Sequence, residues 1–236
     1  MTERLYQRDS YLKTFEARIT AIRPEAVALD RTAFFPAGGG VLGDEGSLGA
    51  AGDTWRVLET FEDGGEVWHR LDRAGLNAGD AVRGDLDWPR RNLLMRYHTA
   101  CHVLSGVMFN DYKVRVTGNQ LTPEKGRVDF AFEQFDRALL EEGFRRANAL
   151  IERDLPVRIS FLPADQAKCR PELFKLETAF PHELSELRLV DIVGFDVQAD
   201  GGCHVASLKE VGRIALSKLE NKGKANRRVY FTLAQV

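Results

Sequence analysis

The 236-residue chain has few cysteines, no long apolar run and almost no net charge, and each shortage excludes a class of protein. Three cysteines, at positions 101, 169 and 203, make a poor disulfide framework and suggest reduced thiols. No segment approaches the roughly 18 consecutive apolar residues of a membrane span, and the N-terminus lacks the apolar core of a signal peptide. A net charge of −2 with 44% hydrophobic residues excludes a disordered polyelectrolyte. We therefore expect a folded cytoplasmic protein without a membrane partner.

The charge is unevenly distributed along the chain. Residues 205–236 carry seven basic and two acidic side chains, which leaves −7 for the remainder. Such a local excess of positive charge can attract a polyanion, although a basic surface hairpin without a partner is about as common. The length fits one large or two modest domains, and no internal repeat or low-complexity segment is present.

Up to residue 88 the chain reads as short β-type segments separated by glycine and acidic turns. Apolar residues alternate in several segments, and the turns GDEG, EDGG and NAGD recur at the spacing of a small barrel or sandwich. We therefore expect residues 1–88 to form a β-barrel-like domain. Its predicted strands are 15–22, 26–30, 54–61, 65–71 and 81–88.

The pattern changes at Asp87-Trp88-Pro89, where proline suits a first helical turn and the following residues take a 3.6-residue period. A helix is predicted as far as Asn110-Asp111, and Asp136 is typical of the N-cap of a second helix. Residues 89–236 therefore belong to the α+β class, with helices packed on a largely antiparallel sheet. Strands are predicted at 114–117, 127–132, 157–161, 187–192, 212–219 and 228–233.

Two of the five histidines stand four residues apart in the first predicted helix. His98 and His102 would lie one above the other on a single face, within reach of one metal ion. His204 follows a glycine turn, with Asp200 four residues before it and Cys203 beside it. These are zinc-ligand residue types and favour a metal site, although the histidine pair alone is about as often structural.

Two familiar enzyme classes are disfavoured by the same motifs. A zinc protease of the HExxH type needs a glutamate after the first histidine, and this chain has Thr99 there. The glycine run at 38–40 lacks the GK[ST] ending of a P-loop and the strand-to-helix context of a dinucleotide-binding motif.

Several segments together resemble the free-standing alanyl-tRNA editing proteins, the AlaX family, which are similar to the editing domain of alanyl-tRNA synthetase. A glycine-rich run at 32–46 is similar to a motif of the longer members, which carry an N-terminal β-barrel. The resemblance extends from about residue 12 to the C-terminus. The other matching segments are RNLLMRYHTACHVLSG, VTGNQL with RVDF, DVQADGGCHVASLKEVG and ENKGKANRRVY.

The resemblance implies a hydrolase that cleaves the ester between a wrong amino acid, above all serine and sometimes glycine, and the 3′ end of tRNA(Ala). It also implies one zinc ion, with His98, His102 and His204 on ligand positions. The fourth position, usually cysteine, is Asp200 here, and Cys203 takes the place of a threonine. Three arrangements are open: Asp200 binds the metal, a water molecule takes the fourth position with Asp200 nearby, or Cys203 binds as the thiolate. The turn geometry of the family favours Asp200. The ion could activate water, polarise the ester carbonyl or anchor the aminoacyl adenosine.

The same resemblance implies the substrate-binding residues. Thr117 and Gln120 match the segment that lines the pocket, and we expect Thr117 to contact the serine hydroxyl; a strand-end turn is the structural alternative. Cys101 is either pocket wall or helix packing. The other expected substrate contacts are Gly38, Gly39, Gly40, Arg96 and Cys203, and the expected tRNA contacts are Lys222, Lys224, Arg227 and Arg228.

The expected partner is therefore the acceptor end of tRNA(Ala) with its attached amino acid, and neither DNA nor an obligatory protein partner is indicated. Two other functions stay open. One is deacylation of another aminoacyl-tRNA, as in the related threonyl system. The other is a non-catalytic tRNA- or metal-binding protein, in which the family's metal site was lost when Asp200 and Cys203 replaced the usual cysteine and threonine.

Overall fold

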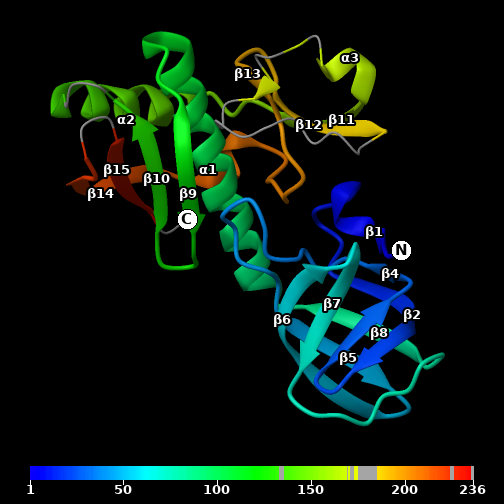
Figure 1. Cartoon of the computed structure of the whole chain (residues 1–236). Helices are drawn as coiled ribbons and strands as arrows, with labels where there is room; N and C mark the ends of the chain where they lie inside the picture. Colours follow the sequence, from blue (N-terminus) through cyan, green and yellow to red (C-terminus); the bar gives the residue numbers. More distant parts are fainter. Residues whose placement is uncertain (133–135, 169, 171–172, 175–184, 224–225, 235–236) are drawn as a thin grey trace. The chain divides into compact units, whose positions relative to one another are not determined.

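The computed structural model describes the chain except residues 133–135, 169, 171–172, 175–184, 224–225 and 235–236 (Figure 1). The chain divides into two compact units, Met1–Leu94 and Met95–Val236. Within the described residues, no helix has the length and apolar character needed to cross a membrane. The expected combination of an N-terminal barrel and an α+β domain is confirmed.

The first unit is built around a closed antiparallel barrel, in which the strands follow the order β2-β3-β7-β6-β5-β8 (Figure 1). Alternating side chains such as Phe15, Ala17 and Ile19 of β2 fill its interior, because successive residues of a strand point to opposite faces. A short parallel pair, β1 (Glu3–Arg4) and β4 (Arg31–Thr32), and the 3-10 helix Leu5–Gln7 complete the unit. The barrel strands are β2 (Thr14–Arg23), β3 (Ala26–Leu29), β5 (Gly46–Ala50), β6 (Asp53–Asp63), β7 (Glu66–Leu71) and β8 (Ala81–Leu86).

One barrel strand, β5, is missing from the sequence prediction. Its sequence, GSLGA, has few residues that favour a strand. It forms because closure of the barrel needs a strand between β6 and β8, and β5 pairs with both. A Cβ at Gly46 would lie 2.2 Å from the carbonyl oxygen of Asp85, so glycine is required at this close approach.

In the second unit, α1 (Trp88–Tyr112) runs between two antiparallel sheets (Figure 1). The predicted apolar stripe of this helix is buried, but so is nearly every other residue between Leu94 and Met108. The helix is buried on all sides because it contacts both sheets. Tyr97 packs on Phe231 of one sheet, and the carbonyl of His102 accepts a hydrogen bond from Gln198 of the other.

The first sheet has the strand order β14-β15-β10-β9, with β9 (Val116–Leu121) and β10 (Gly126–Ala131) joined by a tight hairpin. Its other strands are β14 (Ile214–Asn221) and β15 (Asn226–Leu233). Helix α2 (Arg137–Glu152) covers the same face as α1, since Phe144 and Tyr97 both contact Phe231. The Asp136 N-cap is confirmed, because its carboxylate accepts from the backbone N–H of Leu139.

The second sheet, β11-β12-β13, consists of β11 (Val157–Pro163), β12 (Glu186–Ile192) and β13 (Asp196–Ala199). Helix α3 (Ala164–Lys168) follows β11, and a 3-10 helix, Leu208–Val211, precedes β14. Asp200 comes directly after β13, and the backbone at 206–208 is tied to the start of β11 by hydrogen bonds to Val157 and Leu155. The turn that carries His204 is therefore anchored at both ends.

The strand predicted around 114–117 overlaps β9 but ends too early. Strand β9 continues to Leu121, and Asn119 and Gln120 pair with Val128 and Arg127. Glycine and asparagine at 118–119 look like turn residues, but the pairing with β10 overrides that local preference. The hairpin turn lies at 122–125, where the N–H of Thr122 donates to the carbonyl of Lys125.

Candidate metal centre

Four side chains from two segments converge on one point in the second unit. His98, His102, Asp200 and His204 each offer one ligand atom, and these atoms lie within 4.8 Å of one another. The carboxylate of Asp200 lies 3.5 Å from His98 Nε2, 3.7 Å from His102 Nε2 and 3.2 Å from His204 Nε2. All three histidines therefore present Nε2 to the same carboxylate.

Helix α1 supplies two of these ligand atoms without any loop. His98 and His102 are one helical turn apart, and their ring centroids are 5.0 Å apart. Gln198 of β13 donates to the backbone carbonyl of His102 and also contacts Ser105, so the second sheet holds this turn of the helix. The side chains of His98 and His102 are almost completely buried.

The glycine turn after β13 brings Asp200 and His204 to the helix. The guanidinium of Arg188 donates to the carbonyl of Asp200, and the N–H of Asp200 donates back to the carbonyl of Arg188, which extends the β12–β13 pairing by one residue. The N–H of Gly202 donates to Asp200 Oδ1 at 2.6 Å. A Cβ on Gly202 would lie 2.5 Å from the His98 ring, so only glycine allows this approach.

Burial sets the protonation states in the cluster. Loss of solvent lowers the pKa of His102, and it lowers the pKa of His204 well below its ordinary value. Burial opposes ionisation of Asp200, but the three surrounding imidazoles outweigh it, and the pKa of Asp200 lies well below its usual range. Burial therefore favours the uncharged imidazole at His102 and His204, and the surroundings favour the carboxylate form of Asp200; these are the forms that bind metal.

These residues fit a zinc ion. Three imidazole nitrogens and one carboxylate oxygen are a donor set that zinc accepts, and the four ligand atoms lie close enough together to share one ion. Asp200 is the most exposed of the four, at 18%, so the open side of the cluster is the side of the carboxylate. Cys203 is buried but is not a member of the group.

Cys101 lies on α1 next to the cluster, and burial raises the pKa of its thiol to about 12. The thiol is therefore uncharged at neutral pH. The side-chain amide of Asn119 donates to Cys101 Sγ at 3.9 Å, which places Asn119 on the face of β9 that meets the helix.

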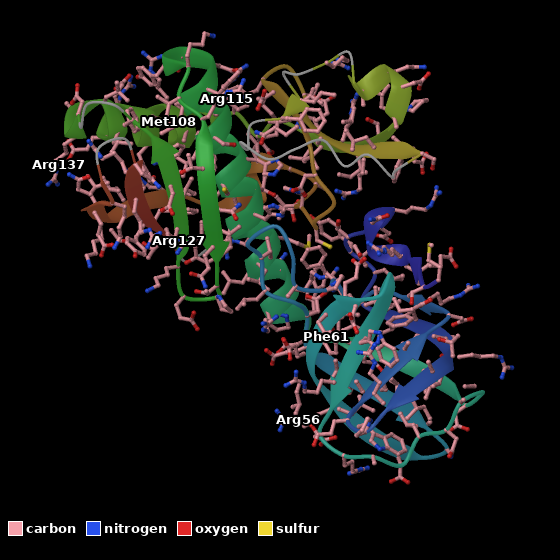
Figure 2. The ribbon with its side chains drawn as sticks, viewed as in Figure 1. Arg56, Phe61, Met108, Arg115, Arg127 and Arg137 are labelled. Atoms are coloured by element: carbon pink, nitrogen blue, oxygen red, sulfur yellow. The ribbon has the colours of Figure 1, made fainter. Side chains whose placement is uncertain are left out.

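Thr117 and Gln120 lie on the opposite face of this sheet. Gln120 pairs in register with Arg127, and Figure 2 shows Arg127 on the side of β10 away from α1. The hydroxyl of Thr117 lies 3.2 Å from the carbonyl oxygen of Asp129 and 3.3 Å from Asn226 Oδ1. Both residues are exposed, and the structure does not bring either of them to the four-residue cluster.

The expected substrate contacts Arg96 and 38–40 also have structural roles. The guanidinium of Arg96 donates to the carbonyls of Val211 and Ala234. Gly38 and Val41 exchange two backbone hydrogen bonds across a tight turn, with Gly39 and Gly40 at φ 59° and 83°. Positive φ at both central residues is typical of a type I′ turn and favours glycine.

The expected tRNA contacts differ in their availability. Lys222 is exposed and pairs with Glu220 at 2.9 Å. Arg228 makes two 2.8 Å hydrogen bonds to Asp129, and Arg227 is buried and donates to Asn221 and the carbonyl of Gly223. A buried guanidinium that already holds its own hairpin is poorly placed to reach phosphate. Lys224 lies outside the described residues.

Comparison with known proteins places the chain in a family. The model described as threonyl and alanyl tRNA synthetase second additional domain matches residues 187–230, and the model for class II (A) tRNA synthetases matches residues 8–90. An alanyl-tRNA editing protein AlaX-M from Saccharolobus solfataricus is 41% identical over 236 residues, which is 99% of each chain. The chain belongs to the AlaX family of alanyl-tRNA editing proteins.

Other relatives agree with this membership. An AlaX-M protein from Methanosarcina barkeri is 40% identical over 99% of each chain. An alanine–tRNA ligase from Ignicoccus hospitalis is 35% identical over 91% of this chain but only 24% of the ligase, so the likeness covers one part of the larger enzyme. The expected family and the expectation of an aminoacyl-tRNA deacylase, a hydrolase, are confirmed.

Sequence reasoning missed three residues that contact the four candidate ligands or the neighbouring Cys101. Strand alternation alone would place Asn119 on the same face as Thr117. A bulge in the β9–β10 pairing, where Gly118 pairs with Asp129 and Val116 with Phe130, turns the two side chains to opposite faces, so Asn119 could not be found from the alternation. Gln198 and Thr99 contact the ligand residues only through the tertiary fold, so no local pattern identifies them.

Proposed function

We propose that this protein removes mischarged amino acids, above all serine and also glycine, from tRNA(Ala) by metal-dependent hydrolysis of the ester, in the cytoplasm. The observation that carries the proposal is the convergence of His98, His102, His204 and Asp200. The relatives are named as alanyl-tRNA editing proteins, which supports tRNA(Ala) as the nucleic acid. Residues 1–88 would then serve as the barrel domain and 89–236 as the editing domain.

The four residues would hold one zinc ion. His98, His102 and His204 offer imidazole nitrogens, and Asp200 offers the carboxylate that replaces the cysteine expected from the family. A zinc ion bound there would supply Lewis acidity for the ester carbonyl or for a water molecule. A carboxylate in place of a thiolate makes the donor set harder, so selectivity for zinc over other divalent ions should be lower.

The chain's own residues would orient the ester and limit access to it. Three of the four ligand side chains are buried, and the carboxylate of Asp200 is the partly open one, so the ester would approach on that side. The uncharged thiol of Cys101 would form part of the wall without competing as a nucleophile.

Serine selectivity would depend on Asn119 and not on Thr117. The Asn119 amide faces α1 beside Cys101, whereas Thr117 lies on the far face of the sheet. An amide has two N–H donors and an acceptor oxygen, more than its contact with Cys101 uses. A serine hydroxyl could satisfy these groups, and alanine would leave them unpaired, which disfavours alanine.

A matched pair of variants tests this assignment. Asn119→Ala should lower kcat/KM for Ser-tRNA(Ala) by about 10–100-fold, the effect of losing a buried hydrogen bond. Thr117→Val, at an exposed position, should leave the serine-to-alanine ratio unchanged. The opposite pattern, with selectivity lost only in Thr117→Val, would reassign the hydroxyl contact to Thr117.

Recognition of the acceptor stem would use exposed basic side chains. Among the described members of the expected set, Lys222 at the β14–β15 hairpin is the exposed one. Arg228 lies on β15 of the same hairpin, but its guanidinium is paired with Asp129. Contacts of this kind position the phosphate backbone without reading its sequence.

The direct test of function is deacylation of Ser-, Gly- and Ala-tRNA(Ala) by the purified protein, with metal content measured on the same sample. We expect release of serine in preference to alanine, loss of activity with a chelator, recovery on adding zinc, and no activity in His98→Ala. Metal-loaded protein that hydrolyses none of the three esters would refute the proposal and favour a binding protein without catalysis.

A further inference from the structure

Thr99 occupies the position between the two histidines of α1, and its side chain is fully buried. The zinc-protease motif HExxH has its catalytic glutamate at this position. Threonine cannot act as that base, so the buried Thr99 needs another explanation. His98 and His102 are placed by the helix itself. His204 comes from a separate segment more than a hundred residues later in the chain, so it needs a contact that brings its ring to the helix.

The hydroxyl of Thr99 makes that contact twice. Thr99 Oγ1 lies 3.1 Å from His204 Nδ1, and it accepts a hydrogen bond from the backbone N–H of Val205 at 3.2 Å. One atom of the helix thus holds both the ring of His204 and the backbone of the next residue. The ring can neither rotate nor withdraw without breaking one of these two contacts.

The contact between Thr99 and His204 also determines which ring nitrogen of His204 carries the proton. A neutral imidazole carries one N–H, and the nitrogen that binds a metal must be the other one. His204 Nε2 is the atom that faces Asp200, so binding at Nε2 requires the proton to be on Nδ1. The Nδ1–H then donates to Thr99 Oγ1, whose second lone pair accepts from Val205.

The other two histidines lack such a contact among the described residues. The buried Nδ1 atoms of His98 and His102 have no hydrogen-bond partner there. Any effect of Thr99 on ligand orientation should therefore act through His204.

We infer that Thr99 is a positioning residue, which fixes the orientation and the tautomer of His204 so that Nε2 is available to a metal ion. The inference rests on the proposed metal site. It assigns no direct contact with substrate to Thr99.

The test uses two variants of the full-length protein. Thr99→Val removes the hydroxyl and keeps the branched shape, whereas Thr99→Ser keeps the hydroxyl. Zinc affinity is measured on metal-free protein by competition with a chromophoric chelator, and the visible spectrum of the cobalt form reports the ligand geometry. We expect zinc affinity about 10–100-fold lower in Thr99→Val, with an altered cobalt spectrum, and values close to wild type in Thr99→Ser.

The outcomes separate this inference from the proposed function. Wild-type protein that binds no zinc refutes the proposed function. If wild type binds zinc and Thr99→Val binds it within about twofold as tightly, or if Thr99→Ser loses as much affinity as Thr99→Val, the inference is wrong. Circular dichroism of the metal-free proteins establishes that they fold, and Thr99→Ala against Thr99→Ser gives the same comparison if the valine variant does not.

Discussion

At the residue scale, the cluster depends on a backbone that passes very close to an imidazole. Gly202 is buried against the His98 ring, and its N–H donates to Asp200, so the same residue sets both the distance and the orientation of two ligands. Gly201, its neighbour, is exposed, and a Cβ there would meet no atom within 4 Å. The two glycines of one turn therefore have different reasons to be present.

Gly202→Ala should abolish stoichiometric zinc binding and deacylation, because the added methyl would overlap the His98 ring. Gly201→Ala is the matched control and should keep both properties within about twofold of wild type. Zinc content by atomic emission and single-turnover deacylation measure the difference. Equal behaviour of the two variants would mean that the turn can move away from the helix.

The residue scale also shows where sequence reasoning was sufficient. The spacing of His98 and His102 and the glycine turn before His204 predicted three members of the observed cluster, since helical spacing is a local property. Asp200, at the family's cysteine position, is the fourth member. The face on which Thr117 lies was not predictable in this way, because it depends on the bulge in the β9–β10 pairing, at which Thr117 is the extra residue.

At the element scale, the start of α1 is fixed by a buried ion pair within the first unit. The Arg91 guanidinium binds the Asp44 carboxylate with Nε at 2.9 and 3.0 Å, and it donates to the carbonyls of Ser10 and Ala33. Asp44 also accepts from the N–H of Phe35 at 2.6 Å. Both side chains are almost fully buried, at 1% and 3% exposure, so each charge depends on the other.

Asp44→Ala should lower the free energy of unfolding by about 3–5 kcal/mol, because it leaves the buried Arg91 charge unpaired. Glu45→Ala is the control. Its partner Arg90 lies 3.0 Å away, but Glu45 is 42% exposed, so the loss should stay below about 1 kcal/mol. Urea unfolding of both variants gives the comparison, and similar losses would show that the buried pair adds little.

At the scale of the whole molecule, stability should depend on pH through a buried histidine of the first unit that is not one of the four candidate metal ligands. His69 of β7 is fully buried in the first unit, where Nε2 contacts the Thr32 hydroxyl at 2.8 Å and Nδ1 contacts the carbonyl of Val27 at 3.2 Å. Burial lowers the pKa of His69 to about 4. The folded protein therefore keeps this ring neutral at pH values where the unfolded chain binds a proton.

The sign of the effect follows from that difference. Above about pH 6.5 both states are neutral, and the full stability is present; as the pH falls toward 4, only the unfolded state gains the proton, and stability is lost. The loss assigned to His69 is about 3 kcal/mol over this range. Unfolding of metal-free protein between pH 7 and 4.5 should show it, and His69→Gln should have a shallower slope. An unchanged slope in His69→Gln would contradict the assignment.

By itself, the sequence determined the elements and most of the ligand set. Five of the six barrel strands, α1, the Asp136 cap and the histidine spacing follow from alternation, helical period and capping, which are local properties of neighbouring residues. The tertiary structure alone decided that β5 closes the barrel, that Asn119 and not Thr117 faces α1, and that Thr99 holds His204. These depend on contacts between distant segments, because pairing register and packing select one face of a strand or one rotamer of a ring, and neighbouring residues do not encode that choice.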